Sequence, residues 1–164
     1  MAVIEKGSFE VISRSPTQTR RLGMRLGELL QPGDVICLEG NLGAGKTTLV
    51  QGIASGWGSY DSVTSPSYVL VNVYRRLDQN QLYHLDAYRL SGPQEAIDLD
   101  IDALLSQGPL LVEWAEKIKE ALPEGHLWMK MRTINEEQRD FIVHARGNRH
   151  QEILEQFRED IYGA

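Results

Sequence analysis

The spacing of apolar residues changes along the chain, and each spacing predicts a different kind of element. An unbroken apolar run over residues 35–38 predicts a buried strand. Further along, Leu49, Ile53 and Trp57 recur at the spacing of one helical face and predict a helix. The glycine-rich segment between them, residues 40–47, predicts a loop. A strand, a glycine loop and a helix therefore follow one another in this order.

The residues before this unit predict a strand and a further helix. Residues 8–12 can form an opening strand. Ser15, Pro16 and Gln18 have the pattern of a helix start: a hydroxyl cap, a proline at the first helical position and a glutamine three residues after the cap. We expect residues 32–33, a Pro-Gly pair, to end this helix. Its apolar stripe consists of Leu22, Leu26, Leu29 and Leu30.

Two later pairs of segments predict antiparallel hairpins. Residues 68–74 and 82–86 have the pattern of strands joined by a polar turn, which is too short for a parallel crossover. Apolar and other residues alternate over 128–131, and a turn at 135–138 leads into an apolar run over 140–144. We therefore expect a mixed sheet.

The remaining segments complete an α/β fold. Residues 93–105 predict an acidic helix, and residues 109–113 predict a short apolar strand that ends in a carboxylate. Asn148 is expected to cap a last helix. The apolar face of that helix consists of Ile153, Phe157 and Ile161. The fold class expected is a single phosphate-loop domain with a mixed, partly antiparallel central sheet flanked by helices.

Length and composition predict one soluble domain over residues 1–164. A chain of 164 residues with 41% hydrophobic residues and a mean hydropathy of −0.33 suits a single globular core. No apolar run is long enough to cross a bilayer, and residues 1–6 lack the basic and apolar regions of a signal peptide. We therefore expect a cytoplasmic protein with no membrane partner.

Charge and cysteine content narrow the classes of function. Seventeen Lys and Arg against 23 Asp and Glu leave a net charge of −6, so the surface as a whole should not attract nucleic-acid backbones. We expect no DNA partner, and we expect any nucleic acid to be held by another protein. The single cysteine, Cys37, excludes an internal disulfide and is expected to be an apolar filler of its strand.

Residues 40–47 match the phosphate-binding pattern G-x-x-x-x-G-K-[ST] at every fixed position. Glycines let the backbone come close to phosphate oxygens, so that amide N–H groups face the anion at the positive end of the helix dipole. Lys46 is expected to reach the β and γ phosphates, and the Thr47 hydroxyl is expected to bind Mg²⁺. The flanking strand and helix disfavour the alternative of a glycine turn without a ligand.

Two carboxylates are candidates for completing a magnesium site, since a phosphate-loop enzyme places one at the end of a strand beside the loop. Glu113 follows an apolar run that can pair with the loop strand. Asp86 ends a more mixed run, and it could act through water or position the nucleophile. Thr64 opens a hydroxyl-rich turn where a nucleotide switch could lie; a capped turn is the alternative. Trp114 could stack on a ligand, but we expect it to pack in the core beside the sheet.

The other acidic residues and histidines are not assigned to a site. Asp98, Asp100 and Asp102 lack the glycine and closing glutamate of a calcium loop, so we expect a solvated acidic face. His84 and His144 have no partner at a metal-ligand spacing and are expected to be structural or surface residues.

Taken together, these motifs give the whole chain a resemblance to one family. The sequence resembles the bacterial TsaE (YjeE) ATPases, which take part in making threonylcarbamoyladenosine beside the anticodon of certain transfer RNAs. The resemblance rests on four segments in the same order: residues 40–48, 64–68, 83–90 and 111–114.

The resemblance implies a slow, partner-dependent ATP hydrolase that uses ATP (ADP after turnover) and Mg²⁺ and works with the TsaB and TsaD proteins. It implies that the catalytic residues are Lys46, Asp86, Glu113 and Thr64, and that the metal residues are Thr47 and Glu113. It implies that the nucleotide is bound by Gly40, Asn41, Leu42, Gly43, Ala44, Gly45, Lys46, Thr47, Thr48, Thr19 and Arg139.

Other nucleotide-binding classes fit less well. Residues 90–94 resemble the signature of transporter ATPases, but a proline at position 93 replaces a glycine, and the interval after the loop is too short for a helical subdomain. A small-molecule kinase would need an arginine-rich lid, and a GTPase would need an Asn-Lys-x-Asp guanine reader. A non-catalytic module gated by nucleotide stays an alternative.

Overall fold

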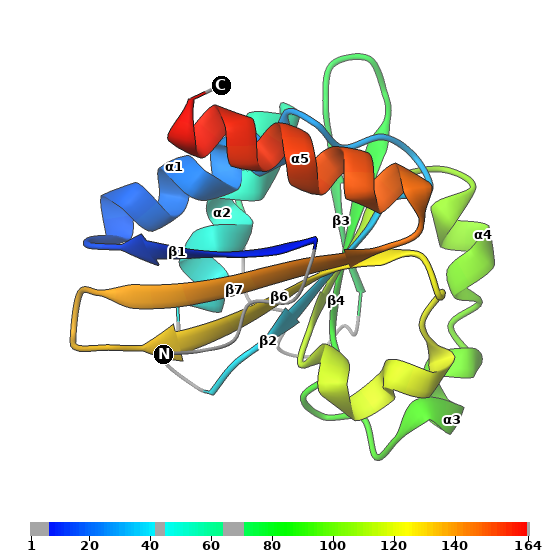
Figure 1. Ribbon diagram of the computed structural model, residues 1–164. Coiled ribbons are helices and arrows are strands. Elements are labelled where there is room, and N and C mark those ends of the chain that lie inside the picture. The colour runs from blue at the N-terminus through cyan, green and yellow to red at the C-terminus, as the bar shows by residue number, and fades with distance from the viewer. Residues whose placement is uncertain (1–6, 42–44, 64–70, 164) are drawn as a thin grey trace.

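The computed structural model describes residues 7–41, 45–63 and 71–163, which form a sheet with helices on both sides (Figure 1). The strands are β1 (Ser8–Ser13), β2 (Val35–Glu39), β3 (Val71–Arg75), β4 (Gln81–Asp86), β5 (Leu110–Glu113), β6 (His126–Thr133) and β7 (Arg139–Arg146). The helices are α1 (Pro16–Gly27), α2 (Lys46–Trp57), α3 (Pro93–Ile97), α4 (Ile101–Leu105), α5 (Asn148–Tyr162) and a 3-10 segment, η1 (Ala115–Ala121).

The described strands form one mixed sheet in the order β1-β7-β6-β2-β5-β4-β3. The loop strand β2 lies between β5 and β6 and is parallel to both, and β4 is parallel to β5. Strands β3 and β4 pair antiparallel, as do β6 and β7, so both predicted hairpins are confirmed over the described residues. Residues 68–70, which were predicted to begin the first hairpin, lie outside the described residues. The α/β class with a partly antiparallel sheet is confirmed as well.

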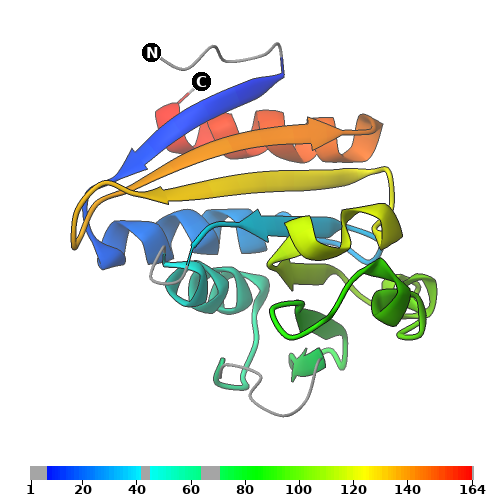
Figure 2. The ribbon, with the colours of Figure 1, turned by 90° about the horizontal axis from the view of Figure 1, so that it is seen from below.

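Each face of the sheet carries its own hydrophobic core, because successive side chains of a strand point to opposite faces. On β2, Ile36 and Leu38 belong to the core under α1, α2 and α5, whereas Val35 and Cys37 belong to the core beside α3, α4 and η1. Figures 1 and 2 show these two groups of helices on either side of the sheet. Cys37 is fully buried and burial raises the pKa of its thiol, so its role as an apolar filler is confirmed.

Helices α1 and α2 touch through their backbones, with glycines at the contact. A Cβ added to Gly52 would lie 2.2 Å from the carbonyl oxygen of Arg20, and one added to Gly27 would lie 2.0 Å from that of Ile53. Gly23 and Gly56 are equally close to backbone atoms of the opposite helix. Any larger side chain at these positions would push the helices apart, so the glycines set how α2 sits against α1.

The start of α1 agrees with the prediction, but its end does not. The Ser15 hydroxyl accepts a hydrogen bond from the Gln18 amide at 3.2 Å, and Pro16 is the first helical residue. The helix ends at Gly27 instead of continuing to residue 32. The chain then tightens into three-residue turns, in which the Leu30 amide donates to the Gly27 carbonyl oxygen.

Two other helix predictions are corrected by the structure. Residues 93–105 form the two short helices α3 and α4, because Asp100 takes a left-handed φ of 51° that interrupts the run. The cap of α5 is Gly147 and not Asn148, which is already the first helical residue. Gly147 has a φ of 87°, a torsion that glycine adopts without the steric cost of a side chain.

Candidate functional site

The candidate site begins where strand β2 gives way to helix α2. Gly40 and Asn41 follow the strand, and Gly45 caps the helix with a φ of 93°. The predicted loop residues Leu42, Gly43 and Ala44 lie outside the described residues. No described side chain bonds to the first-turn amides of α2. These N–H groups point along the helix axis at its positive end, where an anion is stabilised.

Lys46, the first residue of α2, is a buried cation beside this helix end. Its side chain is inside the molecule, with 6% of the residue exposed. The ammonium group donates a hydrogen bond to the Gly40 carbonyl oxygen and lies 3.7 Å from the centre of the Trp114 ring. Burial lowers the pKa of Lys46, whereas Glu113 and, more weakly, Glu116 and Asp86 favour its charged form. Trp114 therefore contacts the site and does more than fill the core.

The hydroxyl residues after Lys46 lie at the same helix end. Thr47 is exposed and Thr48 is half-buried in the first turn of α2. Their place next to the uncapped amides suits a threonine that would bind a metal ion beside a phosphate. The third predicted hydroxyl, that of Thr64, lies outside the described residues.

The two candidate carboxylates come from neighbouring parallel strands. Asp86 ends β4 and Glu113 ends β5, and the two residues are partners in the strand register. Glu113 is buried, and Asp86 is half-buried with its Oδ1 accepting from the Tyr88 amide at 2.9 Å. Burial, and then the nearby Glu113 carboxylate, raise the pKa of Asp86. The fold thus brings Asp86, Glu113 and Lys46 together, although they are far apart in sequence.

A buried histidine, His84, which we expected to be a structural or surface residue, joins this group. His84 Nε2 lies 2.5 Å from Glu113 Oε2, and His84 Nδ1 lies 2.8 Å from the Tyr74 hydroxyl oxygen. The one sequence signal was the spacing of His84 and Asp86, two residues apart on one strand, which puts both on the same face. The partner Glu113 is 29 residues away, so spacing alone could not identify the pair.

The two predicted nucleotide residues outside the loop have other partners in this structure. Thr19 is 2% exposed, and its hydroxyl oxygen lies 2.7 Å from that of Ser13. The Arg139 guanidinium donates to the carbonyl oxygens of Asn135 at 2.6 Å and Gln138 at 2.9 Å within the β6–β7 turn. Its Nε lies 3.5 Å from where a Cβ on Gly45 would be. The structure therefore places Arg139 over the loop end and Thr19 within the packing of α1.

The donor set fits a magnesium ion held partly by phosphate and water. No three Asp, Glu, His or Cys side chains converge as metal ligands within the described part of the chain. Magnesium needs few protein ligands when a nucleotide is present, since it keeps several waters and binds phosphate oxygens. The Thr47 hydroxyl with a carboxylate such as Glu113 meets that need.

The acidic residues Asp98, Asp100 and Asp102 are exposed, as predicted, and Asp100 caps α4.

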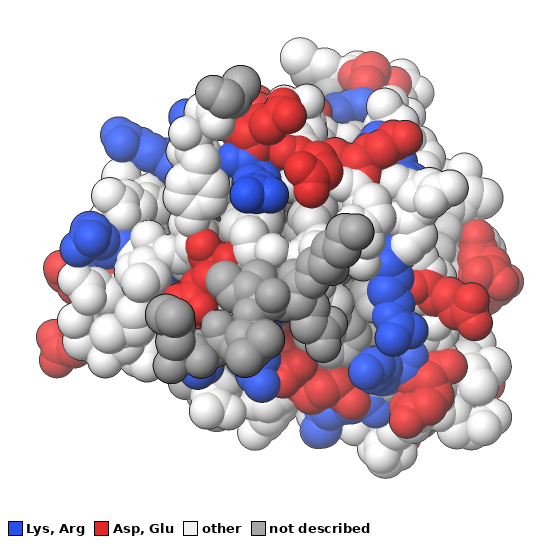
Figure 3. All heavy atoms as spheres, viewed as in Figure 1, with Lys and Arg blue, Asp and Glu red and all other residues white. Residues whose placement is uncertain are grey.

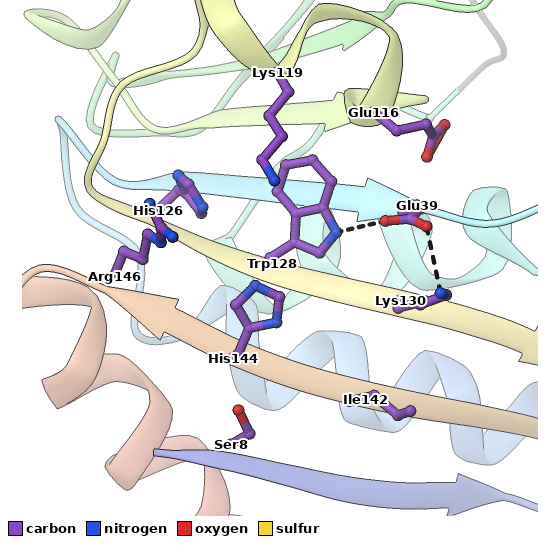
Figure 4. A pocket seen from close by; sticks show the side chains of 10 residues that line it. All are labelled: Ser8, Glu39, Glu116, Lys119, His126, Trp128, Lys130, Ile142, His144 and Arg146. Carbon is purple, nitrogen blue, oxygen red and sulfur yellow. Dashed lines mark hydrogen bonds and ion pairs between the residues drawn. The ribbon is translucent and has the colours of Figure 1, made fainter. Parts of the chain in front are cut away.

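Two cavities adjoin each other on the sheet face that carries η1. One of about 340 Å³ lies beside the loop and is lined by Gly40, Asn41 and Trp114. The other, of about 420 Å³, lies over β6 and β7, where Trp128 Nε1 donates to Glu39 Oε1 at 2.9 Å (Figure 4). Glu39, Glu116 and Lys130 line both cavities, so open space continues from the loop along the sheet.

Acidic and basic side chains are mixed on one face of the molecule (Figure 3). On the face shown in Figure 3, Lys and Arg (blue) and Asp and Glu (red) are interspersed among uncharged residues. On the right of this view, blue side chains touch one another in a short column that has red side chains beside it (Figure 3). Across the described residues, none of the helices is both long enough and apolar enough to cross a membrane.

Comparison with known proteins finds one family over most of the chain. The family model described as "Threonylcarbamoyl adenosine biosynthesis protein TsaE" matches residues 13–141. A Streptomyces coelicolor protein named tRNA threonylcarbamoyladenosine biosynthesis protein TsaE is 47% identical over 114 residues, covering 68% of this chain and 77% of the relative. The Bacillus subtilis protein of the same name is 36% identical over 142 residues, covering 87% and 89%.

A solved structure has the same fold. The crystal structure of Bacillus subtilis YdiB superposes with a TM-score of 0.77 at 30% sequence identity, covering 98% of this chain and 99% of that one. The matched segment, residues 13–141, includes the loop, both hairpins up to the start of β7, and the Asp86 and Glu113 strands. The chain therefore belongs to the TsaE family of threonylcarbamoyl adenosine biosynthesis proteins.

Proposed function

We propose that the protein binds ATP with Mg²⁺ at the amino end of α2 and hydrolyses it slowly in support of threonylcarbamoyladenosine formation on transfer RNA. The observation that carries the proposal is the buried position of the Lys46 ammonium group at the start of α2. Burial and the helix dipole both oppose the charge of this ammonium group, and the pKa of Lys46 stays lowered although the nearby carboxylates favour the charged form. A polyphosphate at this point would offset both effects and would accept hydrogen bonds from the first-turn amides of α2.

The residues predicted for the site have distinct proposed roles. Lys46 would leave the Gly40 carbonyl oxygen and bind the β and γ phosphates, and the first-turn amides of α2 would hold phosphate oxygens. Thr47 and Glu113 would hold the metal ion, which when bound neutralises charge on the phosphates. Asp86, whose raised pKa favours proton exchange, would orient the attacking water, and Thr64 would respond to the γ-phosphate.

Turnover is proposed to be slow in the isolated protein and to depend on partners. An arginine aimed at the transferred phosphate can raise the rate of such reactions by about 10³ to 10⁵. Arg139, which lies over Gly45, has its guanidinium bound to carbonyl oxygens of the β6–β7 turn. The TsaB and TsaD proteins are the proposed partners, with transfer RNA contacted through that complex.

Calorimetric titration with ADP and Mg²⁺ tests nucleotide binding. Lys46→Ala should weaken ADP binding by about 100-fold or more, since it removes a buried charged partner of the phosphates. Lys117→Ala is the matched control, because Lys117 is an exposed lysine on η1 that lines neither of the two cavities. Equal ADP affinity of the Lys46→Ala variant and the unmodified protein would overturn the assignment of the site.

Phosphate release, measured with and without TsaB and TsaD, separates an ATPase from a binding module. We expect slow release by the protein alone, an increase when both partners are present, and no release by Lys46→Ala in either mixture. Tight Mg-ADP binding without phosphate release in any mixture would favour a nucleotide-gated binding module instead.

A further inference from the structure

We propose that His84 is a positioning residue that holds the Glu113 carboxylate in place for the metal ion, and that Tyr74 holds His84. The inference rests on the proposed function, because it assigns a role toward Mg²⁺. It adds two residues, neither of which would touch nucleotide or metal.

The three side chains form a continuous hydrogen-bonded chain across three strands. Tyr74 lies on β3, His84 on β4 and Glu113 on β5, and these strands are adjacent in the sheet. The Tyr74 hydroxyl oxygen is 2.8 Å from His84 Nδ1, and His84 Nε2 is 2.5 Å from Glu113 Oε2. The exposed fractions of the residues are 3%, 1% and 6% in the same order. Water therefore has little access to these bonds.

For an ionised Glu113 and a neutral His84 ring, the chemistry of the groups sets the direction of the hydrogen bonds. An ionised Glu113 only accepts, so His84 Nε2 carries the proton of that bond. In a neutral imidazole the other nitrogen is then an acceptor, and the Tyr74 hydroxyl donates to His84 Nδ1. Each buried polar group of the chain thus has a partner suited to it, which favours one side-chain arrangement over the alternatives.

Fixing Glu113 matters because it ends a strand beside Lys46. A glutamate has several rotamers, and an unrestrained carboxylate could turn toward the Lys46 ammonium, whose charge it already stabilises. With Oε2 held by His84, the second oxygen keeps a fixed direction and is left for a metal ion or its water. Histidines and carboxylates bonded to metal ligands typically change metal affinity by about 10- to 100-fold when they are replaced.

Metal dependence of ADP binding tests this role. Calorimetry would measure ADP affinity without Mg²⁺ and then across a range of Mg²⁺ concentrations. Tyr74→Phe and His84→Gln should each raise the Mg²⁺ concentration for half-maximal strengthening of ADP binding, by about 3-fold and about 10-fold or more respectively. The affinity for ADP without Mg²⁺ should stay within about 2-fold of the unmodified protein, because Lys46 and the loop are untouched.

Tyr83→Phe is the matched control for Tyr74→Phe. Tyr83 is a buried tyrosine on β4 next to His84, but its hydroxyl donates to Gln81 Oε1 at 2.6 Å, away from Glu113. Its removal should leave the Mg²⁺ dependence unchanged. If Tyr74→Phe and His84→Gln both match Tyr83→Phe while the unmodified protein shows Mg²⁺-dependent binding, the positioning role is overturned and the nucleotide site stands.

Nuclear magnetic resonance of the histidine ring nitrogens gives a readout that needs no nucleotide. In the free protein the His84 ring should carry its proton on Nε2, and Tyr74→Phe should shift the Nδ1 signal. A proton on Nδ1, or a ring signal that Tyr74→Phe leaves unchanged, would overturn the inference even if His84→Gln impairs folding. If ADP binding shows no response to Mg²⁺ in the unmodified protein, the proposed function fails and the inference fails with it.

Discussion

Helices α1 and α2 have the same length and lie against each other, yet they begin in opposite ways. Each has 12 residues. The start of α1 is closed by its own residues: the Ser15 hydroxyl accepts from the Gln18 amide, and the Gln18 side chain accepts from the Arg14 amide at 2.8 Å. The start of α2 has Gly45 in place of a capping side chain, followed by the buried cation of Lys46.

The difference separates a helix end that its own side chains close from one that stays open to the proposed nucleotide. A hydroxyl cap such as Ser15 gives a first-turn amide a permanent partner and contributes about 1 kcal/mol to the free energy of unfolding. At a glycine start without a capping side chain, the first-turn amides of α2 stay available to bind an anion. The glycine contacts keep α2 close to α1, and they do so without a cap at the start of α2.

A third helix shows that an uncapped start alone does not make a ligand site. Helix α5 also begins with a glycine, Gly147, and with no described side-chain cap. Its first-turn residues serve the fold: Arg149 binds the Asp34 carboxylate at 2.9 Å and 3.0 Å, and His150 Nε2 accepts from the Val35 amide at 3.0 Å. What distinguishes α2 is therefore the buried lysine together with the nearby carboxylates.

The largest expected effect comes from breaking the contact that holds α2 in place. Gly52→Ala should lower the free energy of unfolding by about 3 kcal/mol, because its Cβ would lie 2.2 Å from the Arg20 carbonyl oxygen on α1. The better helix propensity of alanine, about 1 kcal/mol, cannot compensate for that overlap. Urea unfolding of the variant and of the unmodified protein measures the difference.

Gly92→Ala is the control for that substitution. A Cβ on Gly92 would meet nothing within 4 Å, and its backbone is extended, so the change should stay within about 0.5 kcal/mol. Equal stability of the two alanine variants would show that the helices can separate freely, and the link between the glycine contacts and the open end of α2 would be lost.

The sequence predicts these two helix starts well and the contact between them poorly, for a physical reason. Caps and phosphate loops depend on residue types at fixed local spacing, so Ser15 and residues 40–47 are recognisable without a structure. A glycine within a helical pattern, such as Gly52, does not reveal which backbone comes close to it. The same limit applies to His84, whose partner is set by strand order and not by spacing.

A smaller loss of stability, which depends on pH, is expected at the start of α5. Burial lowers the pKa of His150, and the charges of His126 and Arg149 lower it further, while Asp34 opposes them. Because the folded state binds this proton less readily than the unfolded state, the protein should lose stability as the pH falls below the ordinary histidine pKa of about 6.5.

The size of this pH-dependent loss of stability tests whether the start of α5 serves the fold, in contrast to the proposed nucleotide site at the start of α2. Between pH 7.5 and 5.5, His150 should account for a loss of up to about 1.4 kcal/mol, which is one pH unit of linkage. His150→Gln, which keeps an acceptor for the Val35 amide, should remove that part of the pH dependence. Urea unfolding at both pH values measures it, and an unchanged slope in the variant would mean that another group titrates.

The smallest expected effect is at the closed end of α1, and it completes the contrast with Lys46. Ser15→Ala should lower the free energy of unfolding by about 1 kcal/mol, because the Gln18 amide loses its partner. ADP affinity should not change, since the Ser15 hydroxyl bonds to the Gln18 amide of its own helix and its removal leaves Lys46 in place. Lys46→Ala should do the reverse and weaken ADP binding without loss of stability. If Ser15→Ala weakened ADP binding as much as Lys46→Ala, the two helix ends would act as one unit, and the division between a structural and a functional start would be wrong.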